Sequence, residues 1–186
     1  MAEEKTNLRV LLTTEQIAKR VKELARQISE DYRGKTLHAV CVLENGFIFM
    51  ADLVRGIEVP VVCQFMKPQF TEVQGPSAGG STTEIFFTPE PNVKGQDVLL
   101  IEGLVQSGIT SEFLIRTMMA RGAKSVKLVA FLDKQKERRV SLQPDYFGFL
   151  IDESFVVGYG LGSPHLGRNL PYVASGLPNP ATAAAK

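Results

Sequence analysis

The residues with the clearest chemistry follow a short apolar run near the middle of the chain. Residues 98–101 are consecutive apolar residues, typical of a buried parallel strand, and residues 111–121 predict a helix. The turn between them is Gln106-Ser107-Gly108-Ile109-Thr110. Glycine lets a backbone approach a phosphate closely, hydroxyls donate hydrogen bonds, and a helix N-terminus attracts anions. The pattern predicts a phosphate cradle at 106–110; the alternative is a strand–glycine–helix junction that binds nothing.

Strands and helices alternate around this turn. Thr13 and Gln16 have the spacing of a capping box, which predicts a helix start. The remaining elements are predicted as strands at 37–43, 59–66, 82–87, 125–132, 146–151 and 155–159, and a helix at 47–57. This alternation predicts an α/β fold with a parallel sheet flanked by helices. Ligands of such sheets bind beyond the carboxyl ends of the strands, so residues 44–46, 106–110 and 133–135 should converge on one site.

Two segments do not fit the alternation. Residues 67–81 are rich in glycine and proline and lack apolar spacing, which predicts a mobile loop that could act with the strand at 82–87 as a lid. Residues 174–186 are low in large apolar side chains, and we expect a disordered tail there. Residues 1–173 are then expected to form a single domain.

The composition is that of an ordinary soluble globular protein, with 44% apolar and 22% charged residues among 186. A net charge of +1 predicts no general attraction to nucleic acid or to an anionic membrane. The polar N-terminus is not expected to be a secretory signal. Cys41 and Cys63 lie in apolar runs, and two buried thiols fit a cytoplasmic location. The two histidines have no neighbouring ligand cluster, so no zinc site is predicted.

Several motifs together resemble a known family. Glu102, Ser107, Gly108 and Thr110 match the signature of type I phosphoribosyltransferases. The pieces that resemble hypoxanthine-guanine phosphoribosyltransferases are residues 43–53, 144–149, 155–161 and 168–172, and the similarity runs from about residue 8 to residue 173. The resemblance implies a type I phosphoribosyltransferase-like parallel sheet flanked by helices, with a small hood and a mobile loop. It also implies purine salvage, in which a purine base and phosphoribosyl pyrophosphate give a nucleotide with the help of Mg²⁺, and it suggests a homodimer or homotetramer.

The resemblance assigns roles to particular residues. The 5′-phosphate would bind at Gln106, Ser107, Gly108, Ile109 and Thr110, and the pyrophosphate at Glu44, Asn45, Gly46 and Arg168. The purine would be held by Lys134, by stacking on Tyr146 and by the backbone of Phe147. Glu102 and the position of Gln106 would be catalytic, and Glu102 and Glu153 would lie near the metal ion.

The chain departs from the family pattern where the chemistry occurs. Gly103 stands where a second acid is expected beside Glu102, and Gln106 stands where an aspartate is expected. An amide has no pKa suited to proton transfer, whereas it can donate a hydrogen bond to purine N7 of a bound nucleotide. Glu44 introduces a carboxylate beside the expected pyrophosphate, and we expect aspartates at 103 and 106 to restore activity.

Three functions are compatible with the sequence. The first is a phosphoribosyltransferase-like protein that binds a purine nucleotide, or its phosphate, with weak or lost transferase activity. The second is an active hypoxanthine-guanine phosphoribosyltransferase that makes IMP and GMP. The third is a regulatory or RNA-binding homologue that uses the basic run at 134–139, whose interspersed acids disfavour it.

Overall fold

The structure is a computed structural model, and it describes residues 8–74, 81–88, 90–162 and 167–176. Its helices are α1 (Thr14–Asp31), α2 (Phe47–Arg55), α3 (Ile109–Ala120) and the short 3₁₀ helix η1 (Gln135–Glu137). Its strands are β1 (Arg9–Leu12), β2 (Leu37–Val42), β3 (Val61–Gln74), β4 (Ser81–Thr88), β5 (Asp97–Val105), β6 (Ser125–Asp133), β7 (Tyr146–Leu150), β8 (Val156–Val157) and β9 (Val173–Ser175).

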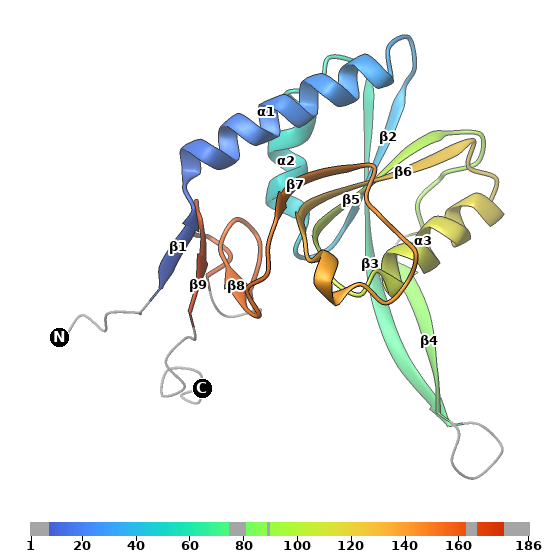
Figure 1. Ribbon diagram of the computed structural model, residues 1–186. Helices are drawn as coiled ribbons and strands as arrows, with labels where there is room; N and C mark the ends of the chain where they lie inside the picture. Colours follow the sequence, from blue (N-terminus) through green and yellow to red (C-terminus); the bar gives the residue numbers. More distant parts are fainter. Residues whose placement is uncertain (1–7, 75–80, 89, 163–166, 177–186) are drawn as a thin grey trace.

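The main sheet has the strand order β4-β3-β2-β5-β6-β7. Neighbouring strands from β3 to β7 run parallel, and β4 pairs antiparallel with β3 at the edge. A second, antiparallel sheet has the order β1-β9-β8 and lies beside the start of α1 (Figure 1). The parallel sheet flanked by helices confirms the predicted fold class, and the second sheet forms the small hood.

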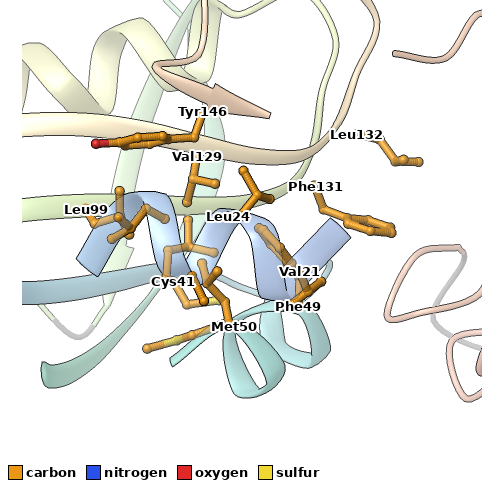
Figure 2. Close-up of a cluster of buried hydrophobic side chains, with 14 of the residues drawn as sticks. Val21, Leu24, Cys41, Phe49, Met50, Leu99, Val129, Phe131, Leu132 and Tyr146 are labelled. Carbon is orange, nitrogen blue, oxygen red and sulfur yellow. The ribbon is translucent and has the colours of Figure 1, made fainter. Parts of the chain in front are cut away.

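The central strand β5 is buried on both faces because helices cover both. Leu99 and Ile101 belong to a core cluster that includes residues of α1 and α2, and Figure 2 shows part of that cluster. Val98 and Leu100 belong to a second cluster, which includes Leu114 of α3. Alternate side chains of a strand point to opposite faces, so a strand covered on both sides needs a continuous apolar run.

The start of α1 confirms the capping box. The Gln16 backbone N–H donates to Thr13 Oγ1 at 3.3 Å, and the Thr13 N–H donates to Gln16 Oε1 at 2.8 Å. The helix places its apolar stripe, Ile17, Val21, Leu24, Ala25 and Ile28, in the core. Helix α1 thereby covers the face of the sheet that α2 also covers.

The predicted loop at 67–81 is mostly a β-hairpin. Strands β3 and β4 pair in register from Lys67↔Thr88 to Gln74↔Ser81, and only residues 75–80 of the predicted loop lie outside the described residues. Figure 1 shows this ribbon extending beyond the rest of the sheet. Because β2 stops pairing with β3 at Met66, Pro68 needs no ladder partner on that side. A ribbon beyond the core also needs no apolar alternation, so the sequence carried no strand signal there.

Two smaller expectations are also corrected. Strand β9 extends through Ser175, and its Ala174 is fully buried, so the ordered chain continues past the predicted boundary at residue 173. The rest of the predicted tail, residues 177–186, lies outside the described residues. Cys41 is buried as expected, whereas Cys63 is exposed. Among the described residues, no helix is long and apolar enough to span a membrane.

Candidate functional site

The turn at 106–110 joins the carboxyl end of β5 to the N-terminus of α3. Gly108 has the left-handed backbone conformation with φ 78°. A Cβ at this position would lie 2.9 Å from Arg138 Cδ and 3.0 Å from Val140 Cγ2, so both backbone and packing require glycine. The Ile109 N–H donates to Ser107 Oγ at 3.4 Å. The predicted strand–turn–helix junction is therefore present, and phosphate binding by it stays a prediction.

A pocket of about 180 Å³ adjoins this turn. Its lining residues are Asn45, Leu104, Gln106, Ser154, Phe155, Val156, Leu161 and Gly162. They come from the turn after β2, the end of β5, the connection between β7 and β8, and the segment after β8. Turns that follow strands thus meet at the carboxyl edge of the sheet, as the sequence predicted.

Lys134 and Gln106 are linked through Glu137. Lys134 is 1% exposed, and its Nζ donates to Ser154 O at 3.0 Å and to Glu137 Oε1 at 3.2 Å. Gln106 Nε2 donates to Glu137 Oε2 at 3.4 Å. The buried ammonium is therefore neutralised by the Glu137 carboxylate. The hydrogen bond of the Gln106 amide is long, and a ligand could replace it.

Glu102 lies on β5, directly before Gly103, and the pKa of its carboxyl is raised. Burial raises the pKa of its carboxyl to about 7, although a hydrogen bond with Ser111 and the charge of Arg138 act in the opposite direction. The side chain is buried, and its Oε1 has no hydrogen-bond partner among the described residues. Near neutral pH this carboxyl is therefore partly protonated and is not a fixed negative charge.

The space beside Gly103 is filled by the chain itself. A Cβ at Gly103 would lie 2.2 Å from the carbonyl oxygen of Asn45 and 2.6 Å from its carbonyl carbon. The same oxygen would be 3.0 Å from a Cβ at Gly160. The turn at 44–46 is therefore seated against two glycines, and an aspartate at 103 requires that turn to move. This contradicts the expectation that Gly103→Asp would simply supply a second ribose ligand.

The residues predicted to bind pyrophosphate do meet. Arg168 Nη1 donates to Glu44 Oε2, and Arg168 Nη2 lies 3.5 Å from Asn45 Oδ1. Lys67 Nζ donates to the other Glu44 oxygen, Oε1, at 2.8 Å. Hydrogen bonds from Arg168 and Lys67 lower the pKa of Glu44 to about 2. Arg168 and Lys67 thus already share one carboxylate of the protein.

Tyr146 and Phe147 are not in the pocket. The Tyr146 ring belongs to the core cluster shown in Figure 2. Its hydroxyl donates to Asp31 Oδ2 at 2.5 Å and accepts from Lys127 Nζ at 3.0 Å. The Phe147 carbonyl accepts from Arg20 Nη2 at 2.8 Å. These contacts contradict the predicted purine-binding roles, because the residues begin β7 and the pocket lies beyond its end.

The predicted site residues include Asn45 and Gln106 of the pocket lining and none of the others. The lining residues that were not predicted are Leu104, Ser154, Phe155, Val156, Leu161 and Gly162, and Ser154, Phe155 and Val156 are the ones that follow β7 directly. The signal was available, since ligands bind beyond strand ends and these residues follow β7, whereas Tyr146 starts it. The resemblance assigned stacking to Tyr146, whose ring lies in the core. Because ligands bind beyond the carboxyl ends of parallel strands, the connection at 151–155 is the better candidate for contact with the base.

The residues present do not fit a dedicated magnesium site. Mg²⁺ in proteins usually takes one or two carboxylates together with substrate oxygens. Glu102 is partly protonated, Gly103 supplies no side chain, and Glu153 accepts from Arg9 Nη2 at 2.9 Å. Among the described residues, no group of three or more His, Cys, Asp or Glu side chains is placed to hold a metal ion.

Three of the four cations in the basic run at 134–139 have acidic partners, and the fourth, Arg139, is exposed. Lys134 is buried, Lys136 Nζ donates to Asp152 Oδ2 at 2.5 Å, and Arg138 pairs with the buried Asp133. Each of these cations already has an acidic partner. The arrangement does not favour an RNA-binding role, which needs cations free to neutralise phosphates.

The parallel sheet, its hood and the turn at 106–110 define a phosphoribosyltransferase-like protein. The chain belongs to the phosphoribosyl transferase domain family, whose model matches residues 9–164. It is 36% identical over 170 residues to the hypoxanthine-guanine phosphoribosyltransferase of Bacillus subtilis strain 168, covering 89% of this chain and 91% of that one.

Solved structures agree with this assignment. A hypoxanthine phosphoribosyltransferase from Staphylococcus aureus superposes with a TM-score of 0.81 at 34% identity, covering 95% of this chain and 94% of that one. A hypoxanthine-guanine phosphoribosyltransferase from Bacillus anthracis superposes with a TM-score of 0.79 at 34% identity, covering 95% of this chain and 100% of that one. Gly103 and Gln106 therefore lie in a scaffold that this chain shares with solved members of the family.

Proposed function

We propose that the protein binds a purine nucleoside 5′-monophosphate at the 106–110 turn and the adjoining pocket, and that its transferase activity is weak or lost. The observation that carries this proposal is the seating of the Asn45 carbonyl against Gly103, 2.2 Å from where a Cβ would lie. The space of a second ribose-binding acid is occupied by backbone. The loss of that acid is therefore built into the packing of the site.

The chemistry of the pocket supports a purine nucleotide. Backbone N–H groups and hydroxyls at 106–110 would hold the phosphate. The Lys134 ammonium, which reaches the pocket through its hydrogen bond to the Ser154 carbonyl, would donate to a 6-oxo group. Phe155 would stack on the base, and the backbone of Val156 would meet the purine edge. Gln106 would exchange its long hydrogen bond to Glu137 for one to N7, which is an acceptor in a nucleotide.

Proton transfer is the step that the site lacks. Gln106 cannot exchange a proton near neutral pH, and general acid–base catalysis contributes roughly 10²–10⁴-fold to rates. The pKa of Glu102 is near neutrality, but its side chain is buried, makes no hydrogen bond or ion pair with a lining residue among the described residues, and does not itself line the pocket. We therefore expect nucleotide binding with slow turnover.

Two measurements test the proposal. Calorimetry with IMP and GMP should detect binding in the micromolar range or tighter, about −8 kcal/mol. Release of pyrophosphate from phosphoribosyl pyrophosphate with hypoxanthine or guanine, in the presence of Mg²⁺, should fall well below ordinary enzyme rates of about 1 s⁻¹. Turnover at or above that rate would show instead that the protein is a working transferase.

The second candidate is an active hypoxanthine-guanine phosphoribosyltransferase of purine salvage. The names of the relatives favour it, and Glu102 is retained. In this case the pyrophosphate-release assay gives rapid turnover with one of the two bases, and Glu102→Gln abolishes it. We also propose a cytoplasmic homodimer or homotetramer, which sedimentation velocity tests.

A further inference from the structure

We propose that Glu44 is a built-in counter-anion that occupies the cation pair formed by Lys67 and Arg168 and makes the site reject ligands with a second phosphate. The ligand class is then a monophosphate rather than a diphosphate. The inference deepens the proposed function and rests on it for the identity of the nucleotide. The closure itself can be measured with inorganic pyrophosphate alone.

The three charged groups form one closed arrangement. Lys67 Nζ donates to Glu44 Oε1 at 2.8 Å, and Arg168 Nη1 donates to Glu44 Oε2. Each carboxylate oxygen therefore receives one cation. Lys67 comes from β3, Glu44 from the turn after β2, and Arg168 from the segment before β9. Separate segments converge on one negative charge, as they would on a bound anion.

Arg168, one of the two cations, lies beside the pocket. Arg168 Nη2 lies 3.4 Å from the Gly162 carbonyl and 3.5 Å from Asn45 Oδ1, and both of these residues line the pocket. Arg168 Nε is buried and has no hydrogen-bond partner among the described residues. The guanidinium thus retains a donor that the carboxylate does not use.

Charge balance explains why a second phosphate is rejected. Two cations and one carboxylate leave a single net positive charge. Pyrophosphate would have to displace Glu44, whose side chain is 39% exposed, or to bind beside a like charge. Because Arg168 and Lys67 hold the pKa of Glu44 near 2, protonation does not open the arrangement at physiological pH. A monophosphate at 106–110 does not require the pair.

The Asn45 backbone adds a steric component to this closure. Its carbonyl is seated against Gly103 and Gly160, which fixes the turn that carries Glu44. A side chain at position 103 would push the turn away. Gly103 and Glu44 therefore act together. Gly103 leaves room for the turn at 44–46 to pack against β5, and Glu44 on that turn neutralises the two cations.

The test is calorimetry with inorganic pyrophosphate on wild-type protein and Glu44→Gln. Glutamine keeps the size of the side chain and removes its charge, so the two cations become available to the ligand. We expect affinity to rise about tenfold or more, as charge-assisted hydrogen bonds predict. The matched control is Glu23→Gln, which removes a 41% exposed carboxylate paired with Arg20 at 3.0 Å, and it should change nothing.

A second substitution identifies the cations. Adding Lys67→Ala to Glu44→Gln should remove most of the gain, because the gain needs both cations. Lys67→Ala in the wild-type background should leave pyrophosphate affinity within about twofold, since Glu44 already neutralises that ammonium. A marked loss in this single variant would overturn the proposal even if Glu44→Gln failed to fold, and so would an unchanged affinity of folded Glu44→Gln.

IMP binding on the same samples separates the two proposals. If wild-type protein binds no IMP while Glu44→Gln gains pyrophosphate affinity, the counter-anion is correct and the nucleotide assignment is wrong. If wild-type protein binds IMP and Glu44→Gln gains nothing, the nucleotide assignment stands and the counter-anion does not.

Discussion

The turn at 106–110 and the turn at 44–46 lie at the same edge of the sheet, but they differ in the groups that they offer to an anion. The first offers a helix N-terminus with Ser107 and Gly108, and the Ser107 hydroxyl accepts a hydrogen bond from the Ile109 N–H at 3.4 Å. The second offers Lys67 and Arg168, which Glu44 already neutralises. The two turns therefore differ in one respect: the cations at the second turn already have a carboxylate partner within the protein, and among the described residues the hydroxyl at the first turn does not.

The largest effect is expected at the open turn. The double substitution Ser107→Ala, Thr110→Ala removes two hydroxyls that would donate to the phosphate, and hydrogen bonds to charged groups are worth about 1.5–3 kcal/mol each. IMP affinity measured by calorimetry should fall on the order of 100-fold. Thr117→Ala, which removes a hydroxyl that donates to Phe113 O at 2.8 Å within α3, is the control. Unchanged IMP affinity in the double variant would remove the cradle from the site.

The closed turn should be sensitive to a single methyl group. Gly103→Ala places a Cβ 2.2 Å from the Asn45 carbonyl oxygen, so the turn must shift. We expect a loss of unfolding free energy of about 3 kcal/mol, at the upper end for overpacking, measured by urea denaturation.

Gly34→Ala is the comparison for that experiment. Gly34 has φ 75° and nothing within 4 Å of an added Cβ, so only backbone strain of about 1 kcal/mol applies. A smaller loss at Gly103 than at Gly34 would mean that the turn at 44–46 moves freely, and the contrast between the two turns would weaken.

Glu102 lies between the two regions and should make stability depend on pH. Its folded pKa of about 7 exceeds the ordinary 4.5, so the folded state holds more protons than the unfolded state between these values. The contribution of this group to the free energy of unfolding is fully present below pH 4.5 and is lost as the pH rises to about 7. The loss is at most roughly 1.4 kcal/mol for each pH unit of that interval.

Glu102→Gln should remove this dependence, because the amide does not titrate. The measurement is urea denaturation of both proteins at several values between pH 5 and pH 8. If the free energy of unfolding varies with pH in the same way in both proteins, Glu102 is ionised throughout this range. It could then act as a negative charge beside the ribose of a bound nucleotide.

The fold was predictable because its signals are local and repeated. The apolar run at 98–101, the capping box of Thr13 and Gln16, and the alternation of strands with helices gave the sheet and its binding edge. The hairpin at 67–74 was missed because its pairing depends on β4 rather than on burial. Strands β1 and β9 were not predicted, because segments of four and three residues are too short to show a periodic pattern.

The site was less predictable because it depends on contacts between distant segments. The turns at 44–46 and 106–110 could be located from strand ends. The pairing of Glu44 with Lys67 and the contact of Asn45 with Gly103 could not, since neither leaves a local pattern. The wrong purine residues, Tyr146 and Phe147, came from matching a motif without asking which end of β7 it occupies.

The smallest predicted effect concerns Gln106. Its amide can donate to N7 of a bound nucleotide, and a neutral hydrogen bond of this kind contributes about 0.5–1.5 kcal/mol. Gln106→Asp replaces this donor with an acceptor and also places a carboxylate near Glu137, which accepts from Gln106 at 3.4 Å. IMP affinity should fall up to about tenfold by calorimetry.

Gln143→Asp, at an exposed position outside the pocket, introduces the same charge and should have little effect. Tighter IMP binding by Gln106→Asp would show that position 106 takes a proton from the purine side, as a catalytic acid does, and the contrast between an open monophosphate site and a closed diphosphate site would no longer account for the substitution.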